Sequence, residues 1–346
     1  MSLAALAGPA AAEARGVVDL PVAFKVKNTN TSAMPCPSDG AEYTVRGELV
    51  GPRSALDRPK SRAVTVYLHG INVGGYMWRL PGFPQFDLPS ALAELGHVSL
   101  VIDELGYDRS DHPNGLQACF GSQADITHQI VQELRNRDYA VSGGSPTSFQ
   151  KVMLGGHDVG ALIADIEIYS YHDVDGLIHL TWADQGFTQE AETNYADLLP
   201  ICASGGQPAE QGPPDRDDPA GGPSGYVQFL SDATIREEQP NVDSAVVDRL
   251  MRLVNRNPCG EEFGIPEAAQ INPQKLPEIH VPVLYGYGEL EFLWTQDGLA
   301  QEAQLFSGSR DLTTVVFRNT GHFPQFSRNA SVFQSTVADW LRAHGG

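Results

Sequence analysis

An aspartate at the centre of a glycine-rich turn is the residue best placed to do chemistry. The segment 151–161 reads KVMLGGHDVGA, and an apolar stretch with helical spacing follows it to Tyr169. Small residues two before and two after Asp158 let the backbone turn sharply from strand to helix, which holds the central side chain in a strained, exposed position. An ionised carboxylate held in this way can attack a saturated carbon that bears a strained or good leaving group, and form an alkyl ester on the protein.

This turn resembles the nucleophile elbow of the α/β-hydrolase family, G-x-Nu-x-G, in which the nucleophile is most often serine. With aspartate, GHD-x-G is similar to the elbows of epoxide hydrolases and dehalogenases. The resemblance implies an α/β-hydrolase fold with a mostly parallel central sheet, helices on both faces and an inserted cap. It also makes His322, in NTGHF, the base and Glu291, in YGELEF, the acid that orients it. The chain order nucleophile, acid, histidine is that of this fold.

Two backbone N–H groups form the oxyanion hole that the resemblance implies. One is that of Ile71, in the loop HGINVGG, and the other is that of Val159, directly after the nucleophile. In such relatives the histidine activates the water that hydrolyses the covalent ester, and the two donors stabilise the resulting oxyanion. Asp184, at the end of the strand after the elbow, is the alternative acid because some relatives draw it from there.

Four aromatic residues are candidates for the substrate pocket. Epoxide opening needs an acid for the leaving oxygen, and relatives use cap tyrosines; Tyr195 and Tyr226 lie in the expected insertion. Trp182 and Trp294 border the site segments, where they can line a pocket or bind a leaving halide through N–H. Ordinary packing is the competing interpretation for all four.

Apolar runs separated by helical patterns predict the elements that position these residues. Continuous apolar strands joined by helices are typical of a parallel sheet covered on both faces. We expect strands at 63–68, 97–102, 152–154, 176–183, 279–287 and 312–317, of which 63–68 is buried, alternating edge strands at 21–26 and 42–50, and helices at 88–96, 124–136, 161–169, 242–254 and 330–344.

The change of pattern after the elbow predicts the domain organisation. Residues 1–20 are expected to be a disordered tail or the remnant of a signal peptide, 21–184 and 279–346 the two parts of the hydrolase core, and 185–278 the cap. Within the cap, residues 204–225 are dense in Gly, Pro, Asp and Ser and therefore predict a long loop.

Composition narrows the class of partner. The 43 acidic and 23 basic residues give a net charge of -20, which disfavours nucleic acid and anionic membrane surfaces. No apolar run approaches the roughly 20 residues that span a bilayer. The chain has no phosphate-binding glycine loop and no C-x-x-C spacing, so we expect neither a cofactor nor a zinc site. A small apolar organic substrate is the expected partner.

The four cysteines favour an exported protein. Residues 2–14 are small and apolar with an A-x-A-like end, as in a trimmed secretory signal. An even number of cysteines in that context favours two disulfides, most simply Cys36–Cys119 and Cys202–Cys259 among three possible connectivities. Buried free thiols in a cytoplasmic protein are the alternative.

Three functions remain open from the sequence. The first is hydrolysis of an epoxide, or less readily of a carbon–halogen bond, through Asp158. The second is a secreted serine-type ester or lactone hydrolase whose elbow serine is replaced by aspartate, by divergence or by deliberate substitution. HGINVGG, the disulfides and Asn72 in place of the HG-x-P proline favour the second. The third is a pseudo-hydrolase that binds a small apolar ligand, which the intact Glu291 and His322 argue against.

Overall fold

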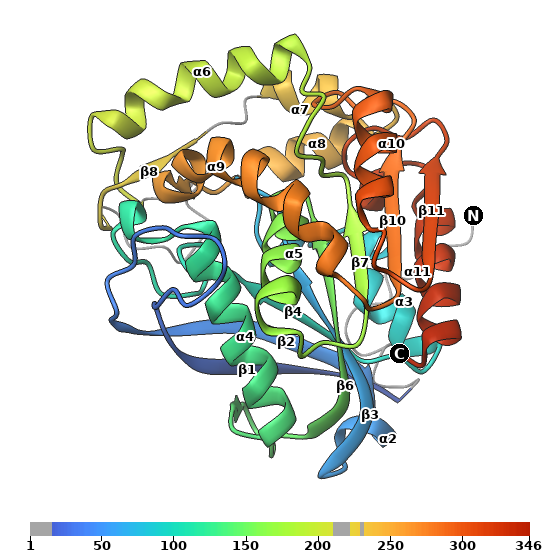
Figure 1. The fold of residues 1–346 in the computed structure, drawn as a ribbon. Helices are drawn as coiled ribbons and strands as arrows, with labels where there is room; N and C mark the ends of the chain where they lie inside the picture. The colour runs from blue at the N-terminus through green and yellow to red at the C-terminus, as the bar shows by residue number, and fades with distance from the viewer. Residues whose placement is uncertain (1–15, 210–221, 229–231) are drawn as a thin grey trace, which may run out of the picture.

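A single mixed sheet runs through the molecule. The computed structural model describes residues 16–209, 222–228 and 232–346. Within these ranges a nine-stranded sheet has the order β11-β10-β7-β6-β3-β4-β2-β1-β5 (Figure 1). Its strands are β1 (Val17–Lys27), β2 (Glu42–Pro52), β3 (Lys60–Leu68), β4 (Ser99–Asp103), β5 (Ala140–Val141), β6 (Ser148–His157), β7 (Leu177–Leu180), β10 (Val283–Gly288) and β11 (Leu312–Phe317).

The direction of pairing changes along the sheet. From β11 to β4 the neighbouring strands are parallel. The β4–β2, β2–β1 and β1–β5 pairs are antiparallel. This confirms the expected mostly parallel sheet with an antiparallel edge. Because the carboxyl ends of parallel strands share one edge, the loops that carry the candidate site residues emerge together there.

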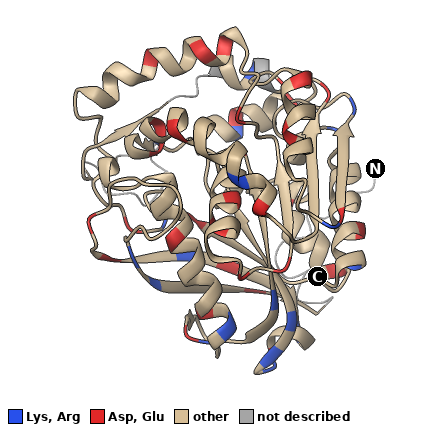
Figure 2. Ribbon diagram, viewed as in Figure 1, with Lys and Arg blue, Asp and Glu red and all other residues tan. Residues whose placement is uncertain are grey.

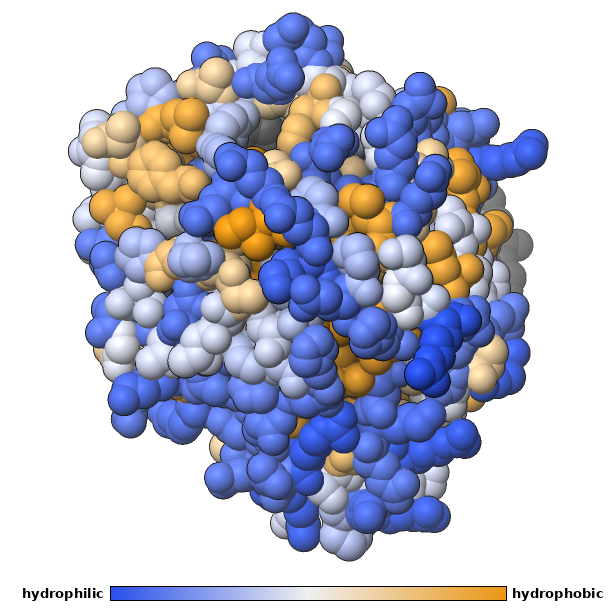
Figure 3. All heavy atoms as spheres, in the orientation of Figure 1, coloured by the Kyte–Doolittle hydropathy of each residue, from blue (hydrophilic) through white to orange (hydrophobic). Residues whose placement is uncertain are grey.

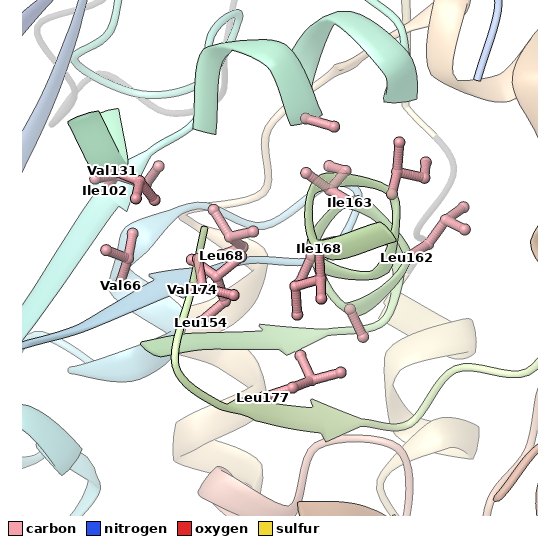
Figure 4. Packing of buried hydrophobic residues seen from close by; sticks show 14 of the residues in the cluster. Val66, Leu68, Ile102, Val131, Leu154, Leu162, Ile163, Ile168, Val174 and Leu177 are labelled. Carbon is pink, nitrogen blue, oxygen red and sulfur yellow. The ribbon is translucent and has the colours of Figure 1, made fainter. Parts of the chain in front are cut away.

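Helices cover both faces of the sheet. On one face lie α4 (Phe120–Asn136) and α5 (Val159–Tyr171), and on the other α3 (Leu88–Glu94) and α11 (Ala330–His344) (Figure 1). Strand β6, which leads into the elbow, contributes side chains to the core on both faces of the sheet, because successive side chains of a strand point to opposite faces. Val152 and Leu154 pack with α5, and Met153 packs with α11. Figure 4 shows Leu154 close to Leu68 and Val174, beside α5. The elbow is therefore anchored in the core.

The elements between β7 and β10 form the insertion. They are α6 (Gln189–Ala203), β8 (Tyr226–Val227), α7 (Asp232–Glu238), α8 (Ser244–Met251), β9 (Asn257–Pro258) and α9 (Cys259–Lys275), with α10 (Gln296–Leu305) following β10. Strands β8 and β9 pair antiparallel. The predicted loop at 204–225 falls largely outside the described residues, at 210–221.

Both predicted disulfides are present. Cys202–Cys259 joins the end of α6 to the start of α9, and Cys36–Cys119 joins the loop after β1 to the residue before α4. Disulfides persist in oxidising compartments. The first bond therefore joins two helices of the insertion, and the second fastens the β1–β2 loop beside α4.

Some elements differ from the sequence expectation. Strand β1 begins at Val17, so residues 17–20 belong to the sheet and not to the tail. Helix α9 was not predicted because Pro266 and Pro273 lie inside it, and proline usually ends a helix. Its contacts with α4, α5 and α6 hold it as a helix despite these residues.

The outer surface is polar and acidic. Figure 2 shows Asp and Glu spread over most helices, including α6, while Lys and Arg gather near α2 (Arg53–Leu56) and β3. The visible face is mostly hydrophilic, with small separate apolar areas (Figure 3). In the described part of the chain, no helix combines the length and apolar character needed to cross a bilayer.

Candidate active site

The elbow holds Asp158 in a strained conformation. Its φ of 55° and ψ of -130° fall outside the regions that L-residues favour, which destabilises the folded chain by about 1–3 kcal/mol. Glycines make the turn possible: a Cβ on Gly156 would lie 2.2 Å from the carbonyl oxygen of Gly160, and one on Gly160 would lie 2.4 Å from that of His69. The Asp158 N–H donates to Leu180 O at 2.9 Å, which fixes the turn against β7.

His322 and Glu291 form a buried pair beside the elbow. His322 Nδ1 lies 3.1 Å from Glu291 Oε1, and their side chains are only 3% and 0% exposed. Glu291 follows β10 and His322 follows β11, so adjacent parallel strands deliver the two residues to the same edge. The pairing with a carboxylate favours the tautomer that carries its proton on Nδ1.

Two backbone donors face the Asp158 carboxylate. Ile71 N donates to Oδ2 at 3.2 Å. Burial raises the pKa of Asp158 to about 6, while the charge of His322 and backbone hydrogen bonds from Ile71 and Val159 oppose the rise. A Cβ on Gly70 would lie 2.8 Å from Oδ2, so glycine is required for this close approach. Asp158 is therefore mostly ionised at neutral pH, with Oδ2 held by the N–H group of Ile71.

Two buried histidines position the loops of the site. His157 Nε2 donates to His322 O at 2.8 Å, and its ring stacks on Phe323. His69 accepts from Glu104 N at its Nε2 (3.1 Å), while its own backbone N–H donates to Glu104 Oε1 (2.7 Å). Burial lowers the pKa of His69 to about 4, so this imidazole stays neutral. These two reciprocal hydrogen bonds hold the loop that contains Ile71, here called the oxyanion loop, against the loop after β4.

Asn72 joins the oxyanion loop to the insertion. Its φ is 56°, which proline cannot adopt, so the HG-x-P proline of some relatives is incompatible with this loop. The Asn72 side-chain amide donates to Asn257 Oδ1 at 2.6 Å and to Asn255 O at 2.9 Å. These contacts couple the position of Ile71 to the insertion.

Two glutamates at the start of α9 have buried carboxyl groups near the elbow. Glu261 accepts from Tyr107 Oη at 2.6 Å and from Gln123 Nε2 at 2.8 Å, and Glu262 accepts from Asn257 Nδ2. Burial raises the pKa of Glu261 to about 7 and that of Glu262 to about 8, with the Asp158 charge a smaller contribution to each. The insertion thus brings two protonatable carboxyls toward Asp158.

Comparison with known families identifies the scaffold. The model described as "Alpha/beta hydrolase family" matches residues 65–334, which span the elbow, the insertion, Glu291 and His322. The chain belongs to this family. No curated protein matches the sequence.

Several solved structures share the α/β-hydrolase fold. A thermophilic esterase from Thermogutta terrifontis, with malate bound, is 18% identical with a TM-score of 0.61, covering 93% of this chain and 99% of its own. A thermostable carboxyl esterase from Bacillus coagulans is 12% identical with a TM-score of 0.61, covering 93% and 98%. A monoacylglycerol lipase from Paleococcus ferrophilus is 16% identical with a TM-score of 0.59, covering 81% and 94%. At these identities the likeness shows the fold.

The alternative acid lies in a separate network of this α/β-hydrolase. Asp184 accepts from Asn272 Nδ2 at 2.8 Å and from Trp182 Nε1 at 3.2 Å. Burial raises its pKa to about 6. The described contact to His322 comes from Glu291, so the structure brings Glu291, and not Asp184, to the histidine.

The four aromatic candidates have their polar groups engaged. Tyr226 Oη donates to Pro113 O and Tyr195 Oη to Glu262 O, each at 2.9 Å. Trp294 Nε1 donates to Ala183 O at 2.6 Å, and its ring stacks beside His322 at a centroid distance of 5.9 Å. Of the four, Trp294 is the one whose ring contacts the histidine; Tyr226 is fully buried.

Three residues of the site, His157, Glu261 and Glu262, were not predicted from the sequence. His157 lies directly before Asp158 in the elbow motif, and this place is the signal that could have indicated a residue that positions the loop of His322. Glu261 and Glu262 lie far along the chain in an unpredicted helix, and only the folded insertion brings them near Asp158.

Proposed function

We propose that the protein hydrolyses an ester or lactone bond, on a serine-type ester-hydrolase scaffold in which Asp158 holds the elbow position. One observation carries the proposal: the His322–Glu291 pair and the Ile71 donor surround the elbow side chain as such a scaffold requires. The solved structures with the same fold include two esterases and a lipase, which supports this substrate class. The two disulfides favour action outside the cytoplasm.

The aromatic side chains also favour ester hydrolysis over the alternatives. An epoxide oxygen needs a proton when the ring opens, and a departing halide needs N–H donors. The hydroxyls of Tyr195 and Tyr226 and the indole N–H groups of Trp182 and Trp294 already donate to other acceptors. An ester with a stable leaving group needs neither kind of donor.

The chemistry of Asp158 defines which esters are suitable. Its ionised carboxylate attacks the acyl carbon, a carbon–oxygen bond of the substrate breaks, and the alkoxide or phenolate leaves. Water that has lost a proton to His322 then hydrolyses the acyl-aspartyl anhydride and restores the carboxylate. Because an anhydride is higher in energy than an ordinary ester, strained lactones and esters with good leaving groups are the expected substrates.

Replacing Asp158 with serine tests the ester scaffold. In Asp158→Ser the hydroxyl takes over the site, and His322 becomes the base that activates it. We expect nitrophenyl-ester hydrolysis to rise by about 100-fold over the unmodified chain. Asp158→Ala is the matched control, since it opens the same space without a nucleophile. A folded Asp158→Ser variant that is no faster than Asp158→Ala would overturn the proposal.

A second candidate is attack by Asp158 on an alkyl carbon, as in epoxide opening. The specific observation in its favour is the bond from Ile71 N to Oδ2, which leaves Oδ1 as the attacking oxygen and holds Oδ2 where the oxyanion would later form. Both candidates use His322 to hydrolyse a covalent intermediate. They differ in the bond that is attacked, so the identity of the trapped adduct separates them.

A further inference from the structure

Glu167 is a buried carboxyl group without a hydrogen-bond partner. It lies on α5, its side chain is 0% exposed, and both its oxygens lack a partner among the described residues. An unpaired buried carboxylate is strongly destabilising, so such a group normally has a cation or a proton beside it. Glu167 has no role in the site at Asp158.

Two other unsatisfied side chains converge on the same point. His128, on α4, places Nδ1 3.9 Å from Glu167 Oε1 and 3.0 Å from Asp173 Oδ2. His128 Nδ1 and Asp173 Oδ1 are buried and lack a hydrogen-bond partner. The three residues offer ligand atoms that all lie within 4.8 Å of one another. One nitrogen and two carboxylates therefore meet between the two helices, which lie side by side in Figure 1.

We propose that His128, Glu167 and Asp173 bind a divalent transition-metal ion, with Zn²⁺ the best fit. The two carboxylates balance its charge, and an imidazole with carboxylates is a ligand set that Zn²⁺ accepts. In a tetrahedral zinc site, ligand atoms about 2.1 Å from the metal lie roughly 3.4 Å apart. The separation of 3.9 Å between His128 Nδ1 and Glu167 Oε1 is close to that value, and one ligand atom from each of the three residues lies within 4.8 Å of the others.

The surroundings support an ion at this point. The His128 ring is oriented by Tyr171, which stacks on it with a centroid distance of 4.0 Å. Gln132 donates to Asp173 Oδ2, so Oδ1 is the oxygen left for the metal. The nearby Arg135 guanidinium donates hydrogen bonds to Asp175 Oδ2 and Asp173 O. The side chains of His128 and Asp173 are 28% and 19% exposed, so water can complete the coordination.

The site is separate from the elbow and serves the scaffold. Glu167 is nine residues after Asp158, which corresponds to about 13 Å along α5. An ion bound there would join α4, α5 and the loop after α5, and so would fasten the helix whose first turn carries the nucleophile. The cysteine spacing that excludes a thiolate zinc site says nothing about these oxygen and nitrogen ligands.

Metal uptake by the untagged, chelator-treated protein tests the proposal. After incubation with Zn²⁺ and gel filtration, we expect one retained equivalent by elemental mass spectrometry and a higher melting temperature, since a ligand that binds the folded state stabilises it. Glu167→Gln should weaken Zn²⁺ binding by about 100-fold or more. Co²⁺ uptake should give a visible spectrum typical of nitrogen and oxygen ligands.

Three further variants keep the test decisive. Glu133→Gln, also on α4 but outside the cluster, should bind Zn²⁺ as the unmodified chain does. His128→Gln removes a ligand whose side chain is 28% exposed, and it serves if Glu167→Gln does not fold. Asp158→Asn should leave Zn²⁺ binding unchanged. The proposal is overturned if the unmodified chain retains no Zn²⁺, if the Glu167 and His128 variants both retain it, or if Asp158→Asn abolishes binding.

Discussion

Glu291 is fixed by its own loop before it meets His322. Its Oε1 accepts the backbone N–H groups of Phe292 and Leu293, each at 3.0 Å, and lies 3.1 Å from His322 Nδ1. Because three donors converge on one oxygen of a fully buried side chain, the carboxylate has little freedom to rotate. This arrangement favours the tautomer of His322 that carries its proton on Nδ1, and it makes Glu291 the proposed orienting acid.

Glu291→Gln should therefore reduce kcat by about 10²–10⁴-fold with a smaller change in KM. The amide keeps the shape of the side chain but loses the charge that stabilises the imidazolium. The measurement is steady-state hydrolysis of a nitrophenyl ester. Asp184→Asn is the matched comparison, since it neutralises the other candidate acid. A larger loss in Asp184→Asn than in Glu291→Gln would reverse the assignment.

The buried Asp158 should reduce stability above its folded pKa. The pKa is raised from 3.8 to about 6, so the folded state holds a proton that the unfolded state has already lost between these values. Stability from this group is thus greatest below pH 3.8 and is lost as the pH rises to about 6. Asp158→Asn should be more stable than the unmodified chain at pH 8, by up to about 3 kcal/mol.

Denaturant unfolding of both chains between pH 4 and 8 measures this effect, and the difference should vanish toward the acid end. Glu190→Gln, on the exposed first turn of α6, is the surface control and should show no such trend. Catalysis by an ionised Asp158 should fall as the pH drops through about 6. An Asp158→Asn variant that is equally stable at pH 8 would show that the carboxylate is not destabilising.

The elbow, Glu291 and His322 could be predicted because each follows a segment with the pattern of a strand. Parallel strands end at one edge, so residues distant in sequence are brought together by a rule that the pattern itself reveals. The six predicted strands all exist, with ends that differ by a few residues, and β11 is largely exposed because it lies at the edge of the sheet. The strained elbow could be predicted from the glycines on either side of Asp158 alone.

Other features depend on contacts that no local pattern encodes. Helix α9 contains two prolines and forms through its contacts with α4, α5 and α6, so Glu261 and Glu262 could not be placed beforehand. His128 and Glu167 belong to different helices, and their convergence depends on how α4 packs against α5. Spacing along the chain gives no sign of either cluster.

The Cys202–Cys259 bond should stabilise the insertion more than the sheet. It closes a separation of 57 residues between α6 and α9, which is worth about 4 kcal/mol in chain-entropy terms. Reduction should therefore expose the insertion to limited proteolysis before the sheet unfolds. Cys36→Ser with Cys119→Ser is the comparison, because it leaves this bond in place. Mass spectrometry that found four free thiols in the unreduced protein would remove both this prediction and the argument for export.

His322→Gln gives the most direct view of the intermediate. In either proposed route Asp158 attacks while already ionised, and His322 is needed only for the water that hydrolyses the covalent species; loss of a general base slows that step by about 10²–10⁴-fold. Intact-mass analysis of the variant mixed with substrate should therefore show an adduct. The added mass of an acyl group would indicate the ester route, and that of a whole epoxide or of a haloalkane minus halide would indicate the alkyl route. Asp158→Asn is the control that cannot form either adduct. If His322→Gln forms none with a compound that the unmodified chain turns over, Asp158 does not attack the substrate.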